Sequence, residues 1–173
     1  GKYWFIASVH PDHPDDYLLS KEEAAKKRDE KKKDADYVVL EEHPFWMNGG
    51  SFRDKSRDAL FTFDAKTGEI RRVTDGDMDV EDAEYINGKF YYWGEKFVGR
   101  PEYRPGLFVI DGERETCLIP QGEKFFSGML KYDGGLAIMM SDGETYSYEE
   151  TPNVYFLNPE TDAIRLLSEN HDN

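Results

Sequence analysis

The chain has 173 residues, of which 38% are hydrophobic and 14% aromatic. A chain of this length with this supply of large apolar side chains folds as one domain with a buried core, which excludes a disordered polymer. We expect no binding to nucleic acid, because a chain with a formal net charge of −14 repels a phosphate backbone.

Cysteine usage and hydropathy set the expected compartment. Cys117 is the only cysteine, so no internal disulfide is expected, and its apolar surroundings (TCLIP) predict a small buried side chain. No apolar run approaches the roughly 20 residues that cross a bilayer as a helix. We therefore expect a soluble cytoplasmic protein that does not contact a membrane.

The first predicted element is a strand at residues 1–8, GKYWFIAS, which aligns with GKFYYWGE at residues 88–95. The next segment, HPDHPDD, predicts either a divalent-metal site or a polar loop that leads into a helix, and its two prolines favour the loop. The metal ligands of the first alternative would be His10, Asp12, His13, Asp15 and Asp16.

A charged helix is predicted next. Ser20 and Glu23 form a capping box, and KEEAAKKRDEKKKD continues with strong helix formers and almost no apolar stripe. This pattern predicts a solvated helix whose lysines are surface charge. A nuclear-localisation or nucleic-acid role for the lysines is the weaker alternative, because the whole chain is acidic.

The segment after the helix, ADYVVLEEHPFWMNGGSF at residues 35–52, returns to strand and loop. It and the residue that follows it supply the candidate substrate-binding residues, which are Glu41, Glu42, Phe45, Trp46 and Arg53. Paired carboxylates beside aromatic side chains are able to hold a peptide amine. The alternative is an exposed strand end with a buried aromatic plug. Arg53 and Arg57 either neutralise the two glutamates or bind a substrate carboxylate, and the sequence does not choose between these roles.

A repeat begins at residue 60. Three segments each consist of an apolar run, a polar turn and a second apolar run. They are LFTFDAKTGEIRRVTDG (60–76), LFVIDGERETCLIPQG (107–122) and VYFLNPETDAIRLLSEN (154–170). The three copies start 47 residues apart. A constant period indicates one structural unit that is repeated along the chain.

Each of the last two copies is preceded by a predicted hairpin, with Asn87-Gly88 or Asp133-Gly134 at its turn. Each repeat therefore predicts four short antiparallel strands, and the continuous apolar runs KFYYW and LAIMM predict inner strands that are covered on both faces. The aromatic residues at strand spacing are expected to pack between repeats and to bind no ligand. They are Tyr91, Tyr92, Trp93, Phe108, Phe125 and Phe126.

This arrangement predicts an all-β fold, a partial β-propeller of about three four-stranded blades, because propeller blades have about 40 to 50 residues. The expected blades of this single partial propeller domain are residues 1–76, 77–122 and 123–173, with the charged helical insertion near residues 10–50 of the first blade. The first blade lacks the strand before its hairpin turn. A β-sandwich is the alternative, although it does not require a fixed period.

Three blades do not close a propeller, which has roughly four to eight. We therefore expect a fragment whose open blade edges associate with a second copy. Asp75, Asp77 and Asp79 resemble the start of a calcium loop, but Val80 and Ile86 stand where an EF-hand needs Gly and Glu. We expect a solvated turn there, no bound metal and no cofactor.

These features together resemble the N-terminal propeller of serine peptidases of the prolyl oligopeptidase family, particularly its acylaminoacyl-peptidase-like branch. The resemblance is carried by the charged helix, by ADYVVLEEHPFWMNGGSF (35–52) and by RDALFTFDAKTGEIRRVTDGDMDVEDAEYINGK (57–89). It implies that the missing blades and an α/β-hydrolase domain with a Ser-Asp-His triad lie elsewhere in a longer chain. The propeller would then filter peptide substrates for that domain.

The resemblance places no catalytic residue in this sequence. A G-x-S-x-G nucleophile elbow is absent, since Ser51 in GGSFR lacks the second glycine. In the related dipeptidyl peptidases a glutamate pair on the propeller binds the substrate amino terminus, which is the role implied for Glu41 and Glu42. A propeller fragment of a binding or scaffold protein is the alternative function. A self-contained propeller enzyme such as a lactonase would need a central ring of metal ligands, which the inner strands do not offer.

Overall fold

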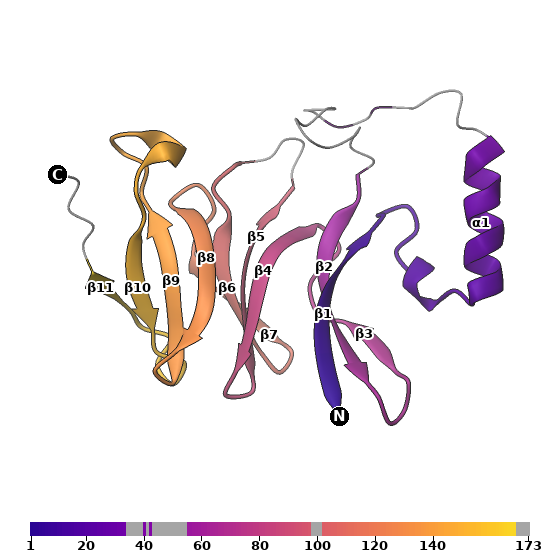
Figure 1. Ribbon diagram of the computed structural model, residues 1–173, viewed down its shortest axis with the longest axis horizontal. Helices are drawn as coiled ribbons and strands as arrows, with labels where there is room; N and C mark the ends of the chain where they lie inside the picture. The colour runs from indigo at the N-terminus through magenta and orange to yellow at the C-terminus, as the bar shows by residue number, and fades with distance from the viewer. Residues whose placement is uncertain (34–39, 41, 43–54, 98–101, 169–173) are drawn as a thin grey trace. The chain divides into compact units, whose positions relative to one another are not determined.

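The computed structural model describes residues 1–33, 40, 42, 55–97 and 102–168, and it is mostly β-structure with three antiparallel sheets (Figure 1). The chain divides into two compact units, of which the first ends at Met78 and the second begins at Asp79. The prediction of a β-rich chain built from short antiparallel sheets is confirmed.

The first unit contains a three-stranded sheet in the order β1-β2-β3. Its strands are β1 (Lys2–Val9), β2 (Arg57–Asp64) and β3 (Ile70–Arg72). Among the described residues this sheet has three strands, one fewer than each of the other two sheets. On one face, Val9, Ala59 and Phe61 form a buried cluster against which Tyr17 packs.

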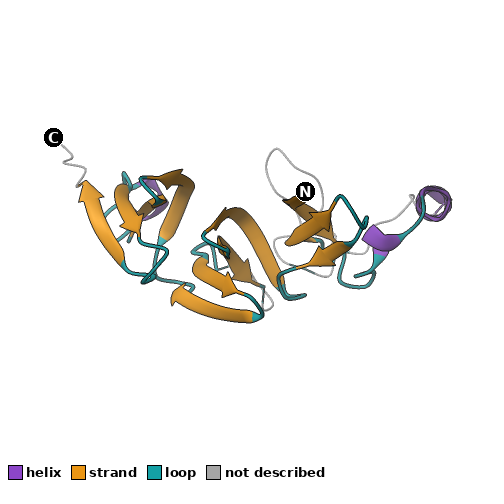
Figure 2. Cartoon of the chain, turned by 90° about the horizontal axis from the view of Figure 1, so that it is seen from below, coloured by secondary structure: helices purple, strands orange, loops and turns teal. Residues whose placement is uncertain are grey.

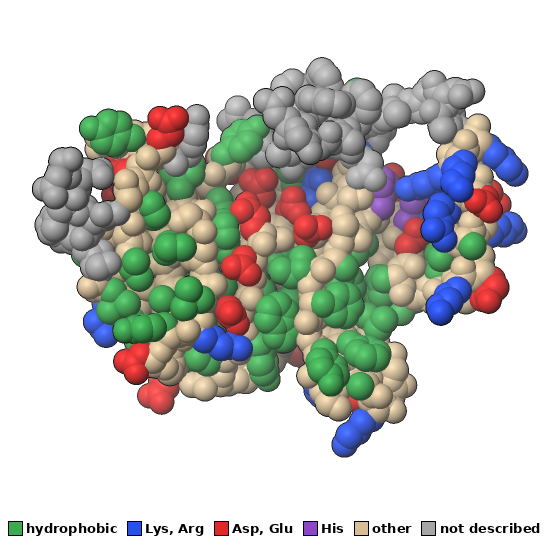
Figure 3. All heavy atoms as spheres, viewed as in Figure 1, with side chains coloured by type: hydrophobic (Ala, Val, Ile, Leu, Met, Phe, Trp, Pro, Cys, Tyr) green, Lys and Arg blue, Asp and Glu red, His purple; other side chains and the backbone are tan. Residues whose placement is uncertain are grey.

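The charged insertion lies between β1 and β2 and contains a 3-10 helix η1 (Asp16–Leu18) and helix α1 (Lys21–Lys33). The capping box is present: the Glu23 N–H donates to Ser20 Oγ at 3.3 Å, and the Ser20 N–H donates to Glu23 Oε2 at 2.9 Å. The helix buries no residue, and Figure 3 shows its Lys and Arg side chains in blue along its surface. No helix in the described part of the chain is long and apolar enough to cross a membrane.

The second unit contains two four-stranded sheets, each a simple up-and-down meander (Figure 2). The first has the strands β4 (Met78–Ile86), β5 (Lys89–Lys96), β6 (Gly106–Asp111) and β7 (Arg114–Ile119). The second has the strands β8 (Phe125–Tyr132), β9 (Gly135–Ser141), β10 (Asn153–Leu157) and β11 (Ile164–Ser168). A short 3-10 helix η2 (Ser147–Glu149) lies between β9 and β10. The four strands predicted for each of these repeats are therefore confirmed.

The two predicted hairpin turns have the expected backbone. Asn87 and Gly88 have φ values of 49° and 85°, and Asp133 and Gly134 have φ values of 47° and 74°. Two successive residues with positive φ form the type I′ turn, whose twist matches that of the flanking strands. The turns place KFYYW in β5 and LAIMM in β9, which are inner strands of their sheets.

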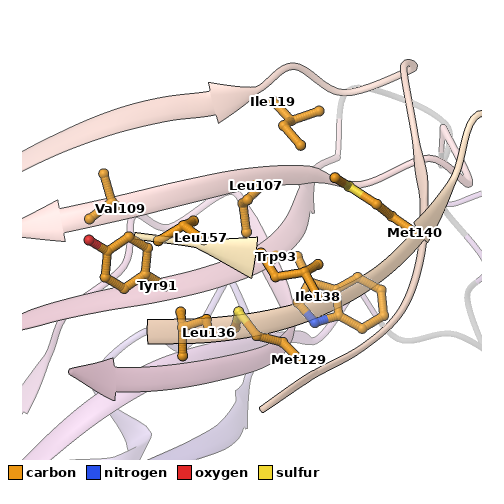
Figure 4. Close-up of a cluster of buried hydrophobic side chains, with 10 residues drawn as sticks. All are labelled: Tyr91, Trp93, Leu107, Val109, Ile119, Met129, Leu136, Ile138, Met140 and Leu157. Atoms are coloured by element: carbon orange, nitrogen blue, oxygen red, sulfur yellow. The ribbon is translucent and has the colours of Figure 1, made fainter. Parts of the chain in front are cut away.

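The core of the second unit lies between its two sheets (Figure 4). Tyr91 and Trp93 of β5 and Leu107 of β6 meet Leu136 and Ile138 of β9 in one cluster of ten buried side chains. The two sheets therefore pack face to face. Packing is also the role that the sequence predicts for the aromatic residues of β5.

The expectation that Cys117 is buried is wrong, because its side chain is exposed. Cys117 lies in β7, which is the last strand of its sheet in the described part of the chain and pairs with β6. A register shift between Leu107 and Phe108 places Cys117 opposite Phe108 and Ile119 opposite Leu107. Ile119 belongs to the core cluster and Leu118 packs against it, whereas Cys117 is not part of the cluster.

Candidate functional site

Glu42 is the one candidate substrate-binding residue that lies within the described residues. It forms an ion pair with Arg57, whose Nη2 donates to Glu42 Oε1. Arg57 is the first residue of β2 and lies opposite Val9 of β1. Both side chains are largely buried, with exposed fractions of 12% for Glu42 and 7% for Arg57. The pair is thus held at the end of the β1–β2 ladder.

The geometry of this pair favours neutralisation as the role of Arg57. Arg57 Nη1 also donates to the Ser56 carbonyl oxygen at 3.0 Å, which fixes the guanidinium beside the carboxylate. The second oxygen of Glu42, Oε2, is buried and has no hydrogen-bond partner among the residues that the structure describes. A buried carboxylate with one paired and one unpaired oxygen retains the capacity to accept one further hydrogen bond.

The other four candidate residues, Glu41, Phe45, Trp46 and Arg53, lie outside the described residues. Their role as a site for a peptide amine stays a prediction.

A group of carboxylates that the sequence analysis missed lies on β4 and β5. Glu95 of β5 is buried, with an exposed fraction of 7%, and accepts a hydrogen bond from the Glu102 N–H at 2.9 Å. Partial burial raises the pKa of Glu81 above its usual value, and the negative charges of Glu95 and Asp79 raise it further. The arrangement concentrates negative charge at one end of the β4–β5 hairpin, and Figure 3 shows acidic side chains in red in the region of β4.

No protein-family model matches this chain, and no curated protein matches it.

The acidic residues of this group are visible in the sequence, but their proximity in space depends on the pairing of β4 with β5. Glu81 and Glu95 are 14 residues apart in the chain, on either side of the Asn87-Gly88 turn. The two arms of the hairpin bring the carboxylate of Glu95 close enough to Glu81 for its negative charge to raise the pKa of Glu81.

A second polar network joins the two sheets of the second unit. The Tyr91 hydroxyl donates to Asp162 Oδ1 at 2.5 Å, and Lys89 Nζ lies 3.0 Å from the same oxygen. Burial and the carboxylate of Asp162 raise the pKa of Tyr91 far above its usual value, so this phenol stays protonated. The network links β5 to the turn between β10 and β11 and stabilises the packing of the two sheets.

The metal site considered for residues 10–16 is not supported. The described residues, which include all of residues 10–16 and 75–79, contain no group of three or more His, Cys, Asp or Glu side chains able to hold a metal ion. The rings of His10 and His13 lie 5.4 Å apart, and Asp16 accepts hydrogen bonds from Lys27 of α1, at 2.6 Å for the closer oxygen. This hydrogen bond lowers the pKa of Asp16. The segment is a polar loop that leads into the helix.

Proposed function

We propose that this chain is a non-catalytic β-propeller segment of a cytoplasmic serine peptidase of the acylaminoacyl or oligopeptidase type. In this proposal the segment gates peptide substrates and helps to position them for a hydrolase domain outside these 173 residues. The observation that carries the proposal is the order of the strands in the two packed sheets of the second unit.

Two contacts join the early strands of these sheets. Lys131 Nζ of β8 lies 3.3 Å from Glu84 Oε2 of β4, and the rings of Trp93 in β5 and Phe126 in β8 are 5.5 Å apart. The first strand of one sheet therefore faces the first strand of the next. Neighbouring propeller blades have this arrangement, because each blade runs from an inner to an outer strand.

The connection between the sheets supports the same interpretation. After β7 the chain returns across its own sheet, where Gln121 Oε1 accepts the Lys96 N–H at 2.7 Å and the Gly122 N–H donates to the Arg104 carbonyl at 2.9 Å. A continuous meander folded into a sandwich would instead leave β7 and β8 at the same edge. A return from the outer strand of one sheet to the inner strand of the next favours the propeller.

The peptidase part of the proposal depends on the sequence resemblance of residues 35–52 and 57–89 to prolyl oligopeptidase family propellers. The charged insertion between β1 and β2 supports it, because α1 lies where the resemblance expects a helix. Glu42, which pairs with Arg57, belongs to the sequence segment 35–52 that carries the resemblance.

The test uses the complete protein encoded by the source gene. A fluorophosphonate probe, which reacts with an activated serine, is expected to label that protein, and replacement of the serine of a downstream G-x-S-x-G by alanine should abolish the labelling. The 173-residue chain is the control and should stay unlabelled.

Hydrolysis of N-acylated peptides by the complete protein should fall sharply as peptide length increases, if the propeller restricts entry. If the reading frame closes a propeller without a G-x-S-x-G segment, the peptidase proposal is wrong and the chain is part of a binding or scaffold protein.

A further inference from the structure

The sheet of β8 to β11 has one apolar face that does not contribute to the core cluster of the second unit, here called the outer face. Strand register defines it: Leu130 lies opposite Ala137, which lies opposite Phe156, and Met139 lies opposite Val154. Residues directly opposite each other in antiparallel strands share a face. The alternate residues of the same strands, such as Leu136, Ile138 and Leu157, belong to the core.

Large apolar side chains on the outer face are exposed to solvent. Leu130 is 52% exposed, Tyr132 is 53% exposed and Met139 is 37% exposed. Figure 3 shows hydrophobic side chains in green in the region of β8 and β9. A group of this kind on an otherwise charged protein indicates a surface that binds a partner.

The repeat identifies what kind of partner fits. Asp133-Gly134 repeats Asn87-Gly88, and Val154 repeats Leu107. By this alignment the outer-face residues correspond to residues of the preceding sheet that pack against β8 to β11. Five outer-face residues have an equivalent that lies in or against the core cluster. The pairs, outer-face residue first, are Tyr132 and Ile86, Ala137 and Tyr91, Met139 and Trp93, Val154 and Leu107, and Phe156 and Val109. The outer face thus has the positions with which one sheet binds the next.

The complementary positions are present and partly exposed on the β1–β3 sheet. The same alignment makes Tyr3, Phe5 and Phe63 the equivalents of Leu136, Ile138 and Leu157, which are the residues that β9 and β10 place in the core. Tyr3 is 61% exposed and stacks on Phe63, and Phe5 is 38% exposed. We call this face of the β1–β3 sheet the aromatic face.

The insertion limits where a partner can lie on the aromatic face. Tyr17 of η1 contacts the ring of Phe61 edge-on, with 4.9 Å between the ring centroids, and so covers the part of the face next to Val9. Tyr3, at the start of β1, is 61% exposed, and Phe5, which lies opposite Phe61 and stacks on it, is 38% exposed. The accessible part lies at the start of the strand.

We propose that the outer face of β8 to β11 binds the aromatic face of the β1–β3 sheet of a second copy of this chain. The contact reproduces between two chains the packing that β4 to β7 makes with β8 to β11 within one chain. Because the two faces differ, the contact is head-to-tail, and repeated contacts of this kind form a ring or an open filament. The proposal depends on the repeat and on the exposed side chains, and it does not depend on the peptidase proposal.

The test measures the molar mass of the 173-residue chain by light scattering after size exclusion, at about 100 μM. The wild-type chain is expected to have at least twice the mass of 20.1 kDa that one copy has. Leu130→Glu should abolish this association, and so should Tyr3→Glu. Tyr146→Glu is the control, since Tyr146 is 62% exposed and lies outside both faces. This variant should associate like the wild type.

Mixing the two variants distinguishes a head-to-tail contact from any symmetric one. The Leu130→Glu chain keeps its aromatic face and the Tyr3→Glu chain keeps its outer face, so an equimolar mixture should form a dimer although each variant alone is monomeric. A monomeric wild-type chain, or a mixture that stays monomeric, would overturn the proposal. So would a Tyr3→Glu chain that still associates, because the outer face would then bind its own copy. If Leu130→Glu loses the circular dichroism of the wild type, Met139→Glu tests the same face.

Discussion

At the scale of single residues, the largely buried ion pair of Arg57 and Glu42 is expected to stabilise the first unit. Arg57→Met leaves the Glu42 carboxylate buried without its cation, and breaking such a pair costs about 3–5 kcal/mol. We expect the free energy of unfolding, measured by urea denaturation, to fall by about 3 kcal/mol. The loss arises mainly from the unpaired charge and less from the missing contact.

The double variant Arg57→Met, Glu42→Leu separates these two causes. Replacing both partners by apolar side chains removes the unpaired charge, so the double variant should be more stable than Arg57→Met alone. If the double variant loses as much as the two single variants together, the pair is not coupled and the assignment of Arg57 as the residue that neutralises Glu42 is wrong.

The raised pKa of Glu81 predicts that the stability of the protein depends on pH. This raised pKa means that the folded state favours the protonated carboxyl. The stabilisation by the protonated carboxyl is complete when the pH is below 4.5, the pKa of Glu81 in the unfolded chain. It is lost as the pH rises through the higher pKa that Glu81 has in the folded chain. Glu81→Gln should therefore raise the melting temperature at pH 7, with a gain below about 1 kcal/mol because water screens a half-exposed carboxylate.

The matched control for Glu81 lies on the same strand. Glu84→Gln also removes one negative charge from β4, but it breaks the ion pair with Lys131. We expect Glu84→Gln to leave the melting temperature unchanged or slightly lower. An equal rise in both variants would mean that the general negative charge of the chain, and not the local group around Glu81, determines the effect.

At the scale of elements, α1 depends on its ends more than on its packing. The helix buries no side chain, so it depends on local interactions such as the capping box of Ser20 and Glu23 and the Lys27–Asp16 ion pair. Glu23→Ala should speed amide hydrogen exchange in residues 21–33, in line with a cost of about 1 kcal/mol for a lost cap. Glu22→Ala, which removes an acidic residue from the same turn without breaking the box, should have the smaller effect. Equal effects would show that only the charge near the helix terminus matters.

Much of the element pattern follows from local sequence. The Asn-Gly and Asp-Gly turns determine where β4 and β8 end, and the capping box determines where α1 begins. The burial of Cys117 was mispredicted because it depends on a register shift in β7, which composition does not encode. The carboxylate group of Glu81 and Glu95 escaped prediction for a related reason, since it exists only when β4 and β5 pair.

At the scale of the whole molecule, net charge is expected to oppose folding. The chain has 36 acidic and 22 basic residues apart from histidine, which gives the formal charge of −14. Like charges destabilise a compact state by mutual repulsion. Exposed ion pairs such as Lys27–Asp16 act in the opposite direction, but each contributes only about 0.2–1 kcal/mol.

Salt should therefore stabilise the protein at neutral pH. Raising sodium chloride from 10 mM to 150 mM shortens the screening length from about 30 Å to about 8 Å, which weakens long-range repulsion more than short ion pairs. We expect the melting temperature at pH 7 to rise by about 2–4 °C, the shift that about 1 kcal/mol produces in a chain of this size. Near pH 4.7, where the sequence predicts no net charge, the same salt should have little effect. A melting temperature that falls with salt at pH 7 would mean that the ion pairs outweigh the repulsion, and the net charge would then not limit the stability of this fold.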